Sequence, residues 1–122
     1  MGLTLRTYAV ASICGVSNIQ IMKETISLLE ALAEPTRLGA LKLLWDGNEH
    51  CVCELMRRLG ASQSRMSRHM ALLKRVGLVV DRRDAQWVRY RRNPRLDPQL
   101  AAVADAAIAT LAANTRRRRA AA

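Results

Sequence analysis

The spacing of apolar residues predicts a mostly helical chain. Residues 1–21 show no clear period, so we expect an N-terminal arm there. Glu34-Pro35 ends the helix that follows, because the residue before proline avoids helical dihedrals while proline itself suits a first turn. Before that break, apolar residues recur at the three- and four-residue intervals of a helix: Met22, Ile26, Leu29 and Leu32 or Ala33.

The helical period continues in three shorter segments after Pro35. Glycines at 47, 60 and 77 are expected to end them, and Ser62 can cap the third. The residues expected to face inward are Leu38, Leu41 and Leu44, then Val52, Leu55, Met56 and Leu59, then Met66, Met70 and Leu73.

The period then changes to one compatible with strands. Leu78–Arg83 and Gln86–Arg92 predict a hairpin joined at Asp84-Ala85. Asp97-Pro98 restarts a helix, with a capping residue followed by a proline suited to the first turn. Its expected seam of mostly small residues would let a partner helix approach closely: Leu100, Val103, Ala104, Ala107, Ile108 and Leu111.

These elements predict a mainly α fold with a small β-hairpin (α+β), in the order of a winged helix-turn-helix. We expect this domain at 22–113, with dimerisation helices at both ends, and a basic disordered tail at 114–122 that carries the Arg116–Arg119 run. With 122 residues, half of them hydrophobic, the chain suits one modest core that gains buried surface as a homodimer. The residues predicted to form the dimer contact are Met22, Ile26, Leu29, Leu100, Val103, Ala107 and Leu111.

The net charge of +10 is concentrated in one segment. Residues 57–95 hold twelve of the twenty Lys and Arg but only two of the ten Asp and Glu. Such a segment is typical of a surface that faces nucleic-acid phosphates, and the alternative is a basic face that serves solubility.

The second helix of a helix-turn-helix presents its first turns to base edges in the major groove. Here that places Gln63, Ser64, Ser67 and Arg68 on the outer face, where Gln can read adenine and Arg can read guanine. Gln63 and Ser64 have an alternative role in stabilising the helix start, and His69 beside this face suits a structural contact equally well. The residues expected to contact phosphates or the minor groove are Arg65, Lys74, Arg82, Arg83, Arg89 and Arg91.

Three motifs occur in a specific order. They are Ala33-Glu34-Pro35-Thr36-Arg37-Leu38, Cys51-Val52-Cys53-Glu54-Leu55, and Ser62-Gln63-Ser64-Arg65-Met66-Ser67-Arg68-His69. Together they resemble the ArsR/SmtB family of metal-sensing repressors, over residues from about 22 to 111. The resemblance implies a homodimeric winged-helix repressor that binds a palindromic operator without ligand and leaves it when a metal binds.

Cys51 occupies the expected N-cap of a helix, with Glu54 at capping-box spacing. Sulfur is a poorer cap than oxygen, which favours another use for it. Residues i and i+2 of a regular helix point about 200° apart. Cys51 and Cys53 are therefore expected to chelate one atom only by distorting the first turn, so that ligand and DNA binding oppose each other.

Soft thiolates select soft acceptors, so we predict As(III) or Sb(III) as inducer, with Pb(II) or Cd(II) as the alternative. Arsenic-sensing relatives carry a third Cys three positions after the second, where this chain has Met56, which we interpret as core. Cys14 on the arm is the candidate third ligand, and its alternative is a buried structural Cys. Without Cys14, two thiols suit an organoarsenical, or arsenite with an outside ligand. His50 is expected to be exposed.

Other readings of the thiols stay open. Cys51 and Cys53 are alternatively a packing pair, a redox switch, or irrelevant to a constitutive DNA binder. Three cysteines are too few for a secreted disulfide scaffold, and no export signal or membrane span is evident. We therefore expect a cytoplasmic protein that is not an enzyme, has no constitutive cofactor, and binds double-stranded DNA.

Overall fold

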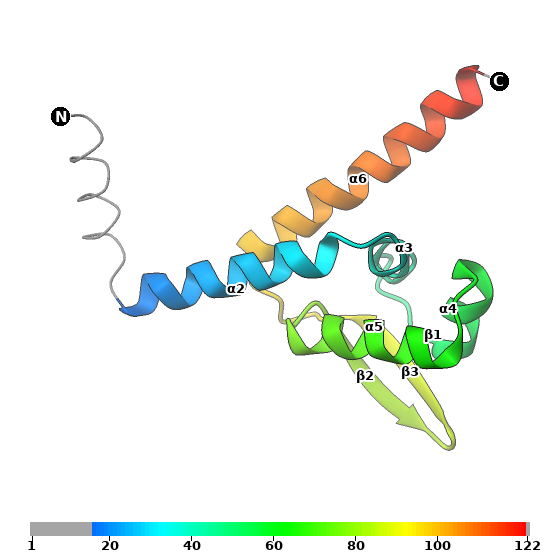
Figure 1. Cartoon of the computed structure of the whole chain (residues 1–122), viewed down its shortest axis with the longest axis horizontal. Helices are drawn as coiled ribbons and strands as arrows, with labels where there is room; N and C mark the ends of the chain where they lie inside the picture. Colours follow the sequence, from blue (N-terminus) through cyan, green and yellow to red (C-terminus); the bar gives the residue numbers. More distant parts are fainter. Residues whose placement is uncertain (1–15, 122) are drawn as a thin grey trace.

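The computed structural model describes residues 16–121 as five helices and a small sheet (Figure 1). The hairpin and the C-terminal helix extend to opposite sides of the molecule. The helices are α2 (Val16–Leu32), α3 (Pro35–Leu44), α4 (Val52–Leu59), α5 (Gln63–Arg75) and α6 (Pro98–Ala121), and the strands are β1 (His50–Cys51), β2 (Val79–Asp84) and β3 (Trp87–Arg92).

Local signals set the helix boundaries where the sequence predicts them. Glu34 is the N-cap of α3, and its carboxylate accepts a hydrogen bond of 2.8 Å from the Arg37 N–H. Gly60 ends α4 in the left-handed region at φ +65°, where its N–H donates to the Met56 carbonyl. Ser62 is the N-cap of α5, also as predicted.

The core forms where the helix-turn-helix packs on α2, α3 and α6. The predicted inward residues of α5 are confirmed, since Met66, Met70 and Leu73 are fully buried. The face of α2 that packs against the core differs from the predicted apolar face. Leu28, Ala31 and Leu32 are buried, whereas Met22, Ile26 and Leu29 are each about half exposed.

The predicted hairpin is confirmed, and a third strand joins it. β2 and β3 pair antiparallel from Val79↔Arg92 to Asp84↔Trp87, and Ala85 in the two-residue loop has φ +54°. β1 pairs antiparallel with the other edge of β3, which gives the order β1-β3-β2. This strand was not predicted, because two residues carry no alternating pattern.

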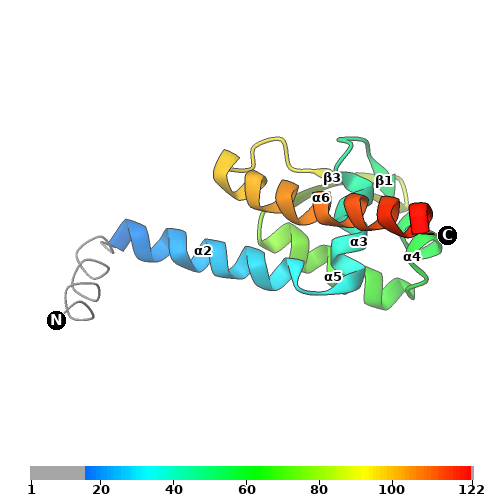
Figure 2. The same cartoon turned by 90° about the horizontal axis from the view of Figure 1, so that it is seen from above.

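Both ends of the described chain are more helical than predicted. α2 begins at Val16 and not at Met22, and Figure 2 shows its first turns extending beyond the other elements. The expected disordered tail is wrong for residues 114–121, because α6 continues through Arg116–Arg119 to Ala121. Alanine and arginine are strong helix formers, so this run prolongs the helix. Within residues 16–121, no helix combines the length and apolar character needed to cross a membrane.

Candidate nucleic-acid interface and thiol pair

The first turns of α5 present polar side chains to solvent. Gln63, Ser64, Ser67 and Arg68 are exposed, opposite the buried methionines. Ser62 supplies the cap, because its Oγ accepts from the Arg65 N–H at 3.3 Å. Gln63 is therefore not needed to cap the helix, and its side chain is accessible for contact with a base edge.

The basic residues expected to meet DNA fall into two groups. Arg82, Arg89 and Lys74 form ion pairs with Glu49, Asp84 and Asp81 at 2.7, 3.1 and 3.0 Å. Within residues 16–121, no such pair within 4 Å involves Arg65, Arg83 or Arg91. The second group is thus available to phosphates, whereas the first must exchange a carboxylate for a phosphate.

Arg37 connects three helices, a role that the sequence analysis did not assign. Its guanidinium donates to the Ala31 carbonyl at 2.7 Å and to the Glu30 carbonyl at 3.1 Å, both at the end of α2. Its Nη1 lies 3.3 Å from Nδ1 of His69, on α5. His69 is only 16% exposed, which supports its structural reading. The Ala33–Leu38 motif contains this residue and was the signal in the sequence that could have identified it.

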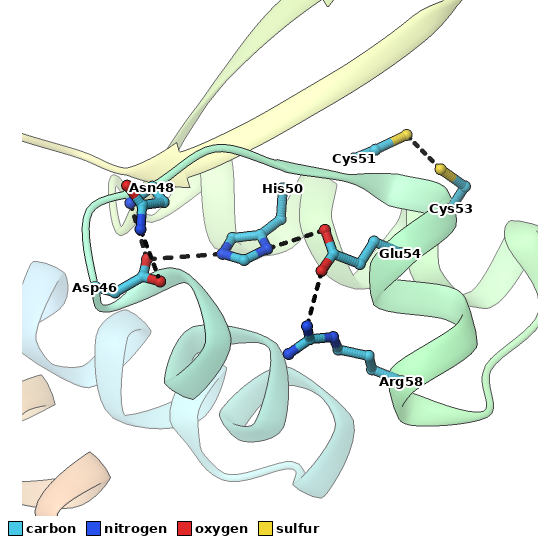
Figure 3. A network of polar contacts seen from close by, with 7 residues as sticks. All are labelled: Asp46, Asn48, His50, Cys51, Cys53, Glu54 and Arg58. Atoms are coloured by element: carbon cyan, nitrogen blue, oxygen red, sulfur yellow. Dashed lines mark hydrogen bonds and ion pairs between the residues drawn. The ribbon is translucent and has the colours of Figure 1, made fainter.

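The two thiols lie side by side at the start of α4. Cys51 has extended dihedrals, φ −68° and ψ 145°, and its side chain caps no N–H. Its Sγ accepts a hydrogen bond from the exposed Cys53 thiol at an S···S distance of 2.6 Å (Figure 3). The expected distortion of the first turn is therefore not needed to bring the sulfurs together, because Cys51 stands outside the helix.

The thiol pair differs from both a disulfide and a chelate in its spacing. A disulfide holds its sulfurs about 2.05 Å apart. Metal–thiolate bonds of about 2.3 Å place two sulfurs on a tetrahedral centre roughly 3.7 Å apart. A shared acceptor of this kind thus requires the two sulfurs to be further apart than in a disulfide. The hydrogen bond to Cys51 raises the pKa of Cys53 and favours the thiol form of that side chain.

A polar network fixes the other side of the same turn (Figure 3). His50 points away from the sulfurs and is only 13% exposed, so the expectation that it is exposed is wrong. Its Nδ1 lies 3.1 Å from Glu54, which also pairs with Arg58 at 3.1 Å. The hydrogen bond with His50 lowers the pKa of Glu54 and keeps a negative charge in the first turn of α4, where the helix dipole favours it.

The thiol turn is also attached to the wing, the hairpin formed by β2 and β3. Cys51 is the register partner of Arg89 in β3. Glu49, two residues earlier, accepts two hydrogen bonds from Arg82 of β2, at 2.9 and 2.7 Å. A shift of Cys51 is therefore transmitted to the wing directly, and not only to α5 through α4.

No third ligand is evident beside the sulfurs in the part of the chain that the structure covers. No group of three or more His, Cys, Asp or Glu side chains there has the arrangement of metal ligands. Met56 packs against the hydrophobic core, as interpreted from sequence. Cys14 lies outside the described residues.

The predicted dimer contacts divide between two helices. Met22, Ile26 and Leu29 of α2 are exposed, by 47%, 52% and 49%. The predicted α6 residues, Leu100, Val103, Ala107 and Leu111, are only partly exposed, and Ala104 beside them is fully buried. The exposed apolar surface therefore lies mainly on α2.

Comparison with known proteins agrees with this geometry. Residues 34–80 match the model of the bacterial regulatory protein, arsR family. The chain is 44% identical over 82 residues to the arsenical resistance operon repressor of Escherichia coli K12, covering 67% of this chain and 70% of that protein. It is 46% identical over 69 residues to the arsenic resistance transcriptional regulator ArsR2 of Pseudomonas putida, covering 57% and 60%.

The fold is similar to that of solved regulators. HlyU from Vibrio cholerae matches with a TM-score of 0.60 and 39% identity, over 69% of this chain and 87% of that one. The family match over residues 34–80 contains α3, the thiol turn and the helix-turn-helix, and it ends within β2. The chain belongs to the arsR family of bacterial regulatory proteins and is a DNA-binding transcriptional regulator, not an enzyme.

Proposed function

We propose that this protein is a metalloid-responsive repressor, released from operator DNA when As(III) or Sb(III) binds Cys51 and Cys53. The observation that carries this proposal is that the Cys51 and Cys53 sulfurs adjoin each other at an N-cap that forms no side-chain cap. Two relatives named for arsenical resistance support the choice of inducer. Sulfur ligands select soft acceptors of this kind.

Release follows from the attachment of the thiol turn to both DNA-contacting elements. When the sulfurs separate to accept a shared atom, Cys51 moves relative to Arg89 in the wing, and Val52–Leu59 moves relative to α5. The ligand then favours one arrangement and DNA the other. A coupling of about 1–3 kcal/mol between such sites weakens DNA binding roughly 5- to 150-fold.

The proposed repressor acts as a homodimer on a palindromic operator. The exposed apolar face of α2, from Ile19 to Leu29, gives two copies of this chain a surface to bury, with the predicted α6 residues beside it. Two reading helices related by a twofold axis then meet two half-sites about one DNA turn apart. Gln63, Ser64, Ser67 and Arg68 are the proposed base contacts.

Cys14 is proposed as the third sulfur for inorganic arsenite, which prefers three. It lies on the N-terminal segment that precedes α2, outside the described residues. Pb(II) is the alternative inducer for three thiolates, and Cd(II) the alternative where a fourth ligand joins them.

The test is a titration of the DNA-bound protein with arsenite, antimonite, Pb(II), Cd(II) and Zn(II), read by fluorescence anisotropy of a duplex selected for binding from a random pool. We expect release by arsenite and antimonite at the lowest concentrations. Cys53→Ser should abolish release while leaving DNA affinity unchanged, and Cys14→Ser should weaken the arsenite response alone. Equal DNA affinity with and without arsenite contradicts the proposal.

The same short S···S distance favours a second candidate, a thiol-redox regulator. Oxidation would close the sulfurs to a disulfide, opposite in direction to the separation that a chelated atom requires. Release by diamide under conditions where arsenite has no effect would support this candidate over the first.

A further inference from the structure

A cavity of about 210 Å³ lies between α4, α5 and the wing, and Cys53 forms part of its wall. Its lining is mixed, with the polar side chains of Gln63, Ser67 and Gln86 facing a set of apolar and aromatic ones. The apolar side chains that line it are Val52, Met56, Trp87, Val88 and Tyr90. Tyr90 is buried and Trp87 is 46% exposed, so the cavity runs from the core side of the wing to solvent.

The size and chemistry of this cavity suit a small hydrocarbon group. A cavity of about 150 Å³ lined by aliphatic and aromatic side chains is sufficient to hold benzene. The hydrocarbon group need not bind alone here, because Cys53 offers a covalent anchor at the wall and Cys51 lies 2.6 Å from it. An atom held by both sulfurs therefore lies beside this cavity, because Cys53 is part of the cavity wall.

We propose that this cavity receives the organic substituent of a trivalent monoorganoarsenical, R–As(OH)2, whose arsenic binds Cys51 and Cys53. This inference rests on the proposed function of the two thiols. Two As–O bonds break and two As–S bonds form. Each hydroxide leaves as water with the proton of one thiol, and arsenic stays trivalent. The As–C bond is retained, so two sulfurs satisfy the arsenic without a third ligand.

The cavity distinguishes this ligand from inorganic arsenite. The third substituent of arsenite bound to two thiols is a hydroxyl, which gains nothing from contact with the apolar wall formed by Val52, Met56 and Trp87. A carbon substituent gains from the same environment, and a phenyl ring gains more than a methyl group because it buries more surface. Met56 occupies the position where a third cysteine would favour the inorganic ligand. Its flexible side chain instead forms part of the cavity wall and can adapt to an organic group.

The position of the cavity also explains how such a ligand acts on DNA binding. Gln63 and Ser67, on the outer face of α5, line one side, and Gln86 at the tip of the wing lines another. A ring seated there touches both elements that are proposed to contact DNA. It therefore changes the spacing between the reading helix and the wing.

The experiment compares phenylarsenous acid, methylarsenous acid and arsenous acid on the full chain carrying Cys14→Ser, which removes the third thiol. Affinity is measured by isothermal titration calorimetry, adduct mass by native mass spectrometry, and DNA release by anisotropy. We expect one arsenical per chain with both hydroxyls lost. The phenyl compound should bind roughly tenfold or more tightly than the methyl compound, as apolar pockets discriminate added carbons.

Trp87→Ala opens the cavity wall and should reduce the ratio of phenyl to methyl affinity to about a third or less of its original value, while methyl affinity changes little. Trp87→Phe is the matched control, because it keeps an aromatic wall and should preserve most of the ratio. Comparing ratios cancels the intrinsic difference between the two arsenicals toward thiols. Trp87 is partly exposed, so neither substitution removes a core residue.

Two results overturn the inference: a ratio of phenyl to methyl affinity near one, or a ratio that Trp87→Ala leaves unchanged. Neither result affects the proposed function if arsenite still releases the wild-type protein from DNA. If none of the three arsenicals binds the wild-type protein or releases it from DNA, the proposed function itself fails.

Discussion

The starts of α4 and α5 occupy equivalent positions in the two helices of the helix-turn-helix, yet they are capped differently. Ser62 caps α5 with an oxygen that accepts from the Arg65 N–H at 3.3 Å. Cys51 stands at the N-cap of α4 with similar extended dihedrals but no side-chain cap. The reading helix thus begins at a satisfied terminus, whereas its neighbour begins at one whose sulfur is directed to Cys53.

The two caps suit different roles: α5 begins rigidly, whereas the start of α4 can change its geometry when a ligand binds. A good cap contributes about 1 kcal/mol to helix stability, and α5 keeps that contribution where base contacts need a fixed backbone. α4 gives it up, and the turn is held from the other side by His50 and Glu54. The weaker terminus is the one where a ligand can change the geometry at small cost.

The largest expected effect comes from making the two caps alike. Cys51→Ser should abolish inducer-dependent release, a loss of the proposed roughly 5- to 150-fold change. It should also raise the free energy of unfolding by about 1 kcal/mol, because serine caps α4. Anisotropy and urea denaturation measure the two effects.

Ser62→Cys is the reciprocal change at α5. It should lower stability by about 1 kcal/mol and create no new response, because Ser64 stands beside it where Cys53 stands beside Cys51. A stabilising Ser62→Cys, or a Cys51→Ser protein that still responds fully, would contradict the comparison.

A third cap extends the comparison to pH. Burial raises the pKa of Glu34, but hydrogen bonds from the Arg37 and Thr36 N–H groups outweigh it, so the net pKa lies below 4.5. A lowered folded pKa adds stability above the unfolded pKa, and this is lost as pH falls through the folded value. Glu34→Gln should therefore cost about 1 kcal/mol at pH 7 and progressively less below pH 4.5.

Thermal melts of both proteins between pH 7 and pH 3 would show the two midpoints converging on acidification. A difference that stays constant across this range would mean that the Glu34 charge contributes nothing to the cap.

The smallest expected effect concerns the wing beside the thiol turn. Arg82 is paired with Glu49, whose pKa this hydrogen bond lowers. Glu49→Gln frees Arg82 for phosphate, so DNA affinity at low salt should rise and the slope of log affinity against log salt should steepen by roughly one. Asp84→Asn is the parallel change at Arg89 and should shift the slope in the same direction. An unchanged slope would mean that Arg82 does not reach the DNA.

Much of the fold follows from local sequence. The period of Met66, Met70 and Leu73, the caps at Glu34 and Ser62, and the left-handed Gly60 act within a few residues of one another, so pattern alone predicted α3 to α5 and the hairpin. The same pattern placed the outer face of α5 correctly. It did not reveal the helical ends, because neither Val16–Ile21 nor the arginine-rich and alanine-rich end of α6 carries a clear apolar period.

Contacts between distant segments were settled only by the tertiary structure. Cys51 is drawn into extended geometry by pairing with β3, and this places its sulfur against Cys53. Arg37 reaches His69, 32 residues away, and Cys53 meets Trp87 across one cavity. The sequence shows which thiols, basic side chains and aromatic side chains are present. Which of them meet depends on how the packed helices and the short third strand direct them, because those contacts form only once the core excludes water.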